Sequence, residues 1–204
     1  MAYPTVSGPY GFQPINLIGG QVFAGSTRLI PIASGSGTSI FYGDVVRLNT
    51  GGTLSKVSTT ATATDAVGIF LGCQFTNPST KQLLQQQYYP ATTVASDIQA
   101  FVLDDPDALF KVAVTAAGTS TISGVTQAAI GLNTALILTA GSTTTGDSLA
   151  SVSATTASVS TLPIRIVAGV PETVNASGSF TEVIVKFNFG THTYYSATGV
   201  ATAA

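Results

Sequence analysis

The stretch IQAFVLDDPDALFKVAV, residues 98–114, constrains the fold more than any other part of the chain. Two runs of strand-forming residues, 98–103 and 109–114, flank the turn sequence DDPDA at 104–108. Pro106 fixes φ at an early turn position, and the aspartate side chains are suited to accept hydrogen bonds from nearby backbone N–H groups. The second run alternates as a half-buried strand does, whereas the first is apolar on both faces. The stretch therefore predicts a β-hairpin in the middle of an all-β core.

Other pairs of short apolar runs, separated by turn residues, predict further hairpins. Residues 45–48 and 54–57 flank the turn NTGGT, and residues 67–76 and 81–89 flank NPST. A short helix over residues 80–87 is the competing interpretation, because Lys, Gln and Leu are good helix formers. Further strand candidates lie at residues 21–32, 135–138, 162–168 and 180–189. We predict an all-β fold: a compact antiparallel barrel or sandwich built of hairpins, with an extended N-terminal arm.

Gly-Asp precedes a strand candidate at residues 43–44 and again at residues 146–147. Two matches of two residues do not establish an internal repeat. The sequence therefore predicts one β domain over residues 21–190, preceded by an arm of residues 1–20 and followed by a small, polar tail of residues 191–204.

Charged residues are scarce, at 8% of the 204 residues, against roughly 25% in typical soluble domains. Uncharged polar groups and apolar atoms must then form most of the surface, which suits a protein that packs against other proteins. The net charge of −2 and seven dispersed basic residues do not favour nucleic acid as a partner, because phosphate binding needs clustered cations. No apolar run approaches the roughly 20 residues of a membrane span, and no secretory signal pattern occurs. We expect no membrane partner and synthesis in a cytoplasm.

Residues 1–20 combine helix-breaking prolines and glycines with aromatic side chains. Proline and glycine prevent a helix here. Aromatic side chains stabilise a structure when they are buried, which a fully solvated tail does not allow. An arm that docks on a neighbouring protein is the interpretation we favour over a disordered terminus. The side chains that we expect to dock on this neighbour are Tyr3, Tyr10, Phe12, Ile15 and Leu17.

The chain offers little that resembles catalytic or ligand-binding chemistry. It has one cysteine, Cys73, and one histidine, His192, and we find no metal-ligand spacing, phosphate-binding loop or G-x-S-x-G pattern. Cys73 lies in an apolar run, so an inert buried thiol is the simpler interpretation. Asp104, Asp105 and Asp107 are suited to a Ca²⁺ site, but turn capping is the interpretation we favour. We predict no enzyme, no catalytic residue, no cofactor and no bound metal.

Three stretches together resemble the head decoration (cement) proteins of tailed bacteriophages, most of all those of marine and cyanobacterial phages. They are PYGFQPINLIGG at 9–20, SDIQAFVLDDPDALFKV at 96–112 and LPIRIV at 162–167. The resemblance implies a structural protein on the outer surface of the virion capsid, bound to the major capsid protein and to itself as a homotrimer. It also implies that the protein locks neighbouring capsomers together and stabilises the head. It supplies no catalytic residues.

Two other functions compete with decoration. A tail or fibre component, such as a carbohydrate-binding adhesin, would use exposed aromatic side chains as sugar platforms, and the candidates are Tyr88, Tyr89, Tyr194 and Tyr195. The absence of tryptophan weakens this alternative. A hydrolase would need the fold to bring Cys73 and His192 together.

Overall fold

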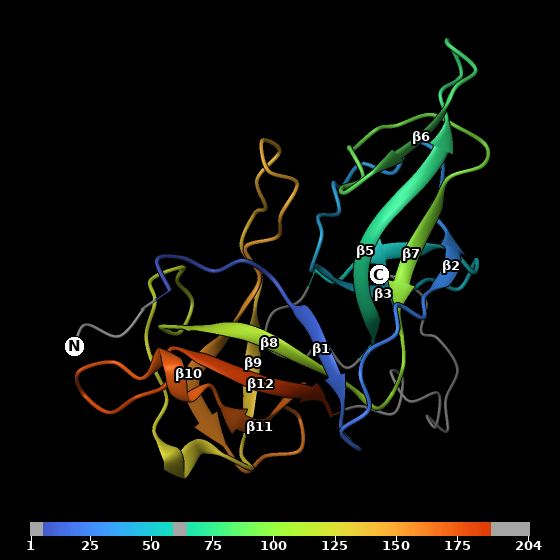
Figure 1. Cartoon of the computed structure of the whole chain (residues 1–204). Coiled ribbons are helices and arrows are strands. Elements are labelled where there is room, and N and C mark those ends of the chain that lie inside the picture. Colours follow the sequence, from blue (N-terminus) through green and yellow to red (C-terminus); the bar gives the residue numbers. More distant parts are fainter. Residues whose placement is uncertain (1–5, 59–64, 189–204) are drawn as a thin grey trace.

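The computed structural model describes residues 6–58 and 65–188, and this part of the chain is all-β, as predicted (Figure 1). It contains twelve strands and two single-turn 3₁₀ helices, Gln127–Ala129 and Pro171–Thr173, but no α-helix. Within these described residues, no helix has the length and apolar character needed to cross a membrane. The strands form two sheets of six.

One sheet closes into a barrel. Its strands are β1 (Gln13–Leu17), β8 (Ala108–Thr115), β9 (Asn133–Ile137), β10 (Ser151–Ala157), β11 (Ile164–Gly169) and β12 (Glu182–Phe187). They follow the order β1-β8-β10-β9-β11-β12, and β12 pairs back onto β8. Closure joins five strands, and β1 lies outside the ring, along β8. The β8–β10 pair is parallel and the other pairs are antiparallel.

The other sheet follows the order β2-β7-β5-β3-β4, with β6 as an additional partner of β5. Its strands are β2 (Arg28–Pro31), β3 (Val45–Leu48), β4 (Leu54–Lys56), β5 (Ala66–Thr76), β6 (Leu83–Gln86) and β7 (Gln99–Leu103). A parallel bridge between Ile32, just after β2, and Leu54 of β4 brings the two ends of this sheet together.

The two sheets are built on one plan. Along the chain the first unit runs β2, β3, β4, β5, β7 and the second runs β8, β9, β10, β11, β12. If the five strands of each unit are numbered by their order along the chain, the order around each ring is first, third, second, fourth, fifth. In both units the first and third strands are the parallel pair. The hairpin strand β6 is an addition to the first unit. The chain therefore contains two structurally equivalent five-stranded units.

Matching backbone hydrogen bonds identify equivalent residues in the two units. In the first, Gly43 N–H donates to the carbonyl of Phe70 at 2.8 Å, and Phe70 N–H donates to the carbonyl of Asp44 at 3.0 Å. In the second, Gly131 N–H donates to Ile166 at 2.9 Å, and Ile166 N–H donates to Leu132 at 3.0 Å. Gly43 and Gly131 have φ of +85° and +87°, a region that favours glycine. Gly131, and not Gly146, is thus the counterpart of Gly43.

The predicted central hairpin is wrong. β7 and β8 do not pair with each other: β7 lies between β2 and β5, whereas β8 belongs to the barrel. The aspartate-rich segment between them still turns locally, since Asp107 N–H donates to Asp105 Oδ1 at 2.8 Å. Both edges of β7 and of β8 are taken by other strands, so the turn links the two units and forms no hairpin.

The other two predicted hairpins are confirmed: β3 pairs antiparallel with β4, and β5 pairs antiparallel with β6. The strand candidates at residues 162–168 and 180–189 correspond to β11 and β12, which pair antiparallel. The alternative helix over residues 80–87 is wrong, because residues 83–86 form β6. The strand expected over residues 21–32 is confined to Arg28–Pro31.

Two hydrophobic clusters form the core, one inside each unit, and the barrel cluster extends onto the outer face of the first unit. Successive residues of a strand point to opposite faces, so Val46, Phe70 and Val102 line the first unit's interior. Their neighbours Val45, Ile69 and Leu103 join the barrel cluster. This double burial explains why residues 98–103 are apolar on both faces.

Candidate interaction surfaces

The N-terminal segment predicted to dock on a capsid instead packs on the protein's own barrel. Phe12 is 0% exposed and lies in the barrel core, with ring centroids 6.3 Å from Phe110 and 5.9 Å from Phe187. Leu17 packs against the same cluster, and Ile15 is half-buried within β1. Tyr3 lies outside the described residues. In this fold Phe12 is not exposed for contact with a capsid protein, and β1 joins residues 13–17 of the predicted arm to a sheet.

Tyr10 is held by a buried acidic group. Its hydroxyl donates a hydrogen bond to Glu182 Oε1, and Lys111 Nζ lies 3.4 Å from the same carboxylate and 5.6 Å from the centre of the Tyr10 ring. Burial, followed by the hydrogen bond and the charge of Glu182, raises the pKa of the Tyr10 hydroxyl above its usual value. The cluster anchors the N-terminal segment to β8 and β12, and it leaves Tyr10 engaged within its own chain.

A buried carboxylate joins the two units. Asp44 is 0% exposed and accepts hydrogen bonds from Phe41 N–H at 2.9 Å and from Ser148 Oγ at 2.6 Å. Lys56 Nζ lies 2.8 Å from Asp44 Oδ2. Because Asp44 and Lys56 belong to the first unit and Ser148 lies just before β10, this network fixes one unit against the other. The two Gly-Asp pairs of the sequence meet here, since Tyr42 and Asp147 form a parallel bridge.

The aspartates of the connecting turn are engaged with cations of the protein itself. Arg28 Nε lies 2.8 Å from Asp104, and Lys186 Nζ lies 3.0 Å from Asp107. Across residues 6–58 and 65–188, no group of three or more His, Cys, Asp or Glu side chains is arranged to hold a metal ion. The alternative of a Ca²⁺ site at this turn is therefore not supported.

The groups weighed for nucleophilic chemistry and for sugar binding are placed unfavourably. Cys73 is buried, and burial raises the pKa of its thiol to about 12. His192, Tyr194 and Tyr195 lie outside the described residues. Tyr89 is 0% exposed, so it offers no platform for a sugar, and Tyr88 is stacked on Phe41 with ring centroids 5.4 Å apart.

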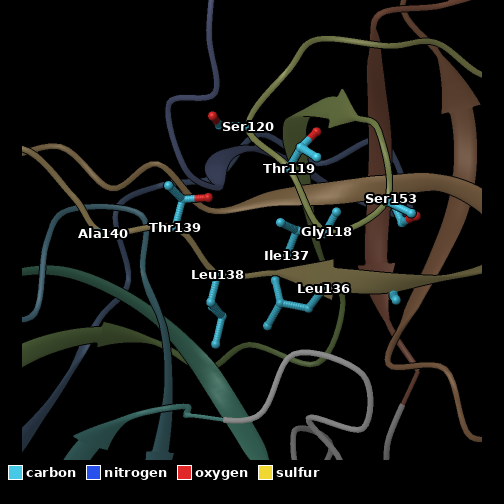
Figure 2. Close-up of a pocket in the computed structure, with 11 residues that line it drawn as sticks. Gly118, Thr119, Ser120, Leu136, Ile137, Leu138, Thr139, Ala140 and Ser153 are labelled. Carbon is cyan, nitrogen blue, oxygen red and sulfur yellow. The ribbon is translucent and has the colours of Figure 1, made fainter.

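An open hollow of about 620 Å³ lies on the second unit, between the turn at residues 117–120 and β9 (Figure 2). Its lining consists of uncharged side chains and backbone, from residues 117–120 and 135–140 and Ser153, and it includes the larger apolar side chains of Leu136, Ile137 and Leu138. None of these residues is a titratable acid or base, so no group in the lining can act as general base for its Ser and Thr hydroxyls.

The turn end of the β5–β6 hairpin projects from the first unit, on the side away from the barrel (Figure 1). Within the described residues, β6 pairs only with β5, which leaves its outer edge open. Leu83 on this strand is 62% exposed, and the buried Oε1 of Gln86 has no hydrogen-bond partner. Open edges are usually protected by charge, proline or a bulge. Residues 83–86 carry neither charge nor proline, so the edge can accept another strand.

Most of the few charges are neutralised within the chain. Five ion pairs join ten of the 16 charged residues. The surface therefore carries fewer unpaired charges than the composition alone indicates.

Comparison of the chain with models of protein families finds no matching family, and comparisons with curated proteins and with solved structures find no match.

Proposed function

We propose that this protein is a structural virion protein that binds the outer surface of a phage capsid and cements neighbouring capsomers. Its partners are the major capsid protein and further copies of itself, as a homotrimer, and it performs no enzymatic step. The proposal begins from the resemblance of residues 9–20, 96–112 and 162–167 to head decoration proteins.

The observation that carries the proposal is the neutral surface combined with an open strand edge. Ten of the 16 charged residues are already paired within the chain, and β6 presents uncharged residues along an edge without a partner among the described residues. Strand addition supplies affinity through backbone hydrogen bonds and specificity through side-chain pockets. Such attachment depends little on salt, because few ion pairs are available to screen.

We assign attachment to the β5–β6 hairpin in place of the N-terminal segment. Phe12 and Tyr10 are engaged in the barrel, whereas Leu83 is 62% exposed on an element that projects from the molecule. Asp97 accepts hydrogen bonds from Thr76 N–H at 3.0 and 3.2 Å, which ties the end of β5, next to the hairpin turn, to the loop before β7. A hairpin held near its turn and open along one edge is suited to strand addition on a capsid protein.

The test is co-sedimentation of the purified protein with undecorated, expanded phage heads at low and high salt, followed by heating of the particles. We expect saturable binding that survives high salt and raises the temperature at which the heads break. Leu83→Lys should weaken binding by about tenfold or more, since about 1.4 kcal/mol corresponds to tenfold in affinity and charge protects open edges.

Val159→Lys is the matched control. Val159 is 50% exposed, on the second unit and away from the hairpin, and this substitution should leave binding unchanged. Absence of binding to heads would refute the decoration function and would direct attention to a tail location and a glycan ligand. Binding that is unaffected by Leu83→Lys would refute the assignment of the hairpin.

A further inference from the structure

We propose that the N-terminal segment, residues 6–17, exchanges between copies, so that β1 of one copy pairs with β8 of a second. The site for this segment is already built in the barrel, and the occupant is the same segment of another molecule of this chain. The inference requires no capsid and is independent of the proposed function.

The receiving site is specific. Gln13 and Pro14 lie opposite Lys111 and Phe110 of β8 in an antiparallel register, and Leu17 lies opposite Ala108. Just before β1, Gly11 N–H donates to the carbonyl of Ala150 at 3.1 Å, and Phe12 N–H donates to that of Gly43 at 3.0 Å. The Phe12 side chain then enters the barrel core. Because these contacts involve only residues 10–17 of the segment, a segment from a second copy can make all of them.

The connection after β1 has the form of a hinge. Within its own chain the segment turns back immediately: Gly20 N–H donates to the carbonyl of Leu17 at 2.9 Å, and Leu17 N–H donates to that of Gln21 at 2.8 Å. Gly20 has φ of +80°, and it follows Gly19. Opening this turn would release the ten or so residues before β2, which in extended form span roughly 33 Å at 3.3 Å per residue. That length reaches an adjacent molecule.

Exposed apolar side chains occur along the chain from the end of β1 to β2. Ile18, Val22 and Leu29 are 52%, 77% and 50% exposed, and they make up three of the six large hydrophobic side chains exposed within the described residues. In an exchanged pair the two connections leave their barrels side by side, so these side chains can be buried between copies. This burial favours exchange, since the contacts between β1 and β8 are the same in both states and cancel. A second copy is thus the occupant that this surface fits.

The test uses a residue pair that faces across β1 and β8. One batch of protein carries Gln13→Cys and another carries Lys111→Cys, two positions directly opposite each other. The batches are mixed at high concentration, unfolded in denaturant, refolded together and oxidised. Both batches also carry Cys73→Ala, because denaturant exposes this thiol, which is buried only in the folded protein. We expect a disulfide-linked dimer containing one chain of each kind, detected by non-reducing gel electrophoresis and mass spectrometry.

The control pair is Arg165→Cys with Lys186→Cys, which face each other across β11 and β12. The proposed exchange moves neither of these strands, so a mixture of these single variants should give at least tenfold less linked dimer. A Gln13/Lys111 mixture that gives no more dimer than this control overturns the proposal. The double variant, with Gln13→Cys and Lys111→Cys in one chain, shows by the same readout whether this pair forms a disulfide. If the disulfide forms only within one chain at every concentration, the exchange proposal is also overturned.

Discussion

Replacing Phe12 with alanine tests whether the N-terminal segment is part of the core. The ring is 0% exposed and contacts the rings of Phe110 and Phe187. A buried aromatic side chain removes about 150–250 Å² from water, and Phe→Ala substitutions in cores cost about 3–5 kcal/mol. We expect a loss of about 3–5 kcal/mol in the free energy of unfolding. For a chain of this size that corresponds to a fall in Tm of about 6–20 °C.

The assay is equilibrium unfolding in denaturant, followed by far-UV circular dichroism, with a thermal scan in parallel. Val94→Ala is the control, because Val94 lies outside the N-terminal segment and its connection to β2 and is 66% exposed; its effect should stay within about 0.5 kcal/mol. If Phe12→Ala costs less than about 1 kcal/mol, the ring does not fill the barrel, and the segment is a free arm after all.

Three further predictions concern groups that the fold buries or constrains. Asp44→Ala should lower the unfolding free energy by about 3–5 kcal/mol, because it leaves the ammonium of Lys56 buried without its counter-charge; denaturant unfolding measures this, and a loss below about 1 kcal/mol would contradict it. Stability should fall as pH rises above about 8.5, the pKa of an unfolded cysteine. The folded Cys73 thiol, with its pKa raised to about 12, keeps a proton that the unfolded chain loses; a Cys73→Ala variant should lose less stability between pH 8 and pH 10, and identical pH profiles for the two proteins would refute the reasoning. Gly43→Ala should destabilise by more than about 1 kcal/mol, since φ is +85° and a Cβ would lie 3.0 Å from the amide nitrogen of Phe12; Gly35→Ala, with positive φ but open space around it, should cost clearly less in the same assay.

Local chemistry determined several elements correctly. The NTGGT and NPST turns join strands that pair with each other, because a short turn brings adjacent runs into register. Alternating apolar residues in residues 109–114 produced a strand with one face in the barrel core. Residues 98–103 were apolar on both faces and proved to be covered on both.

Pairing between distant strands was not accessible to the same reasoning. The DDPD turn has the hydrogen bond expected of it, yet β7 and β8 separate into different sheets because their edges bond to strands far away in sequence. The two Gly-Asp pairs illustrate the same limit. They are not equivalent positions of a repeat: Tyr42, next to the first pair, bonds through its backbone to Gly146 and Ser148. The true counterpart of Gly43, Gly131, is followed by leucine.

The N-terminal segment shows how far the sequence could predict the interaction surfaces. Its prolines and aromatic residues correctly indicated an extended segment that docks, but no sequence pattern distinguishes a foreign surface from the chain's own barrel. The open edge of β6 and the buried Asp44 network were also missed as sites. Leu83 and Asp44 acquire their roles only from exposure and from partners far along the chain, such as Ser148.

The sequence by itself determined the all-β class, the scarcity of charge and the local turns, because each depends on residue type or on neighbours within a few positions. Only the tertiary structure decided that the strands form two equivalent units, that Phe12 completes the barrel core and that most charges are paired internally. Each of these depends on which distant segments satisfy one another's backbone hydrogen bonds and apolar surfaces, and that choice is made by the folded chain as a whole.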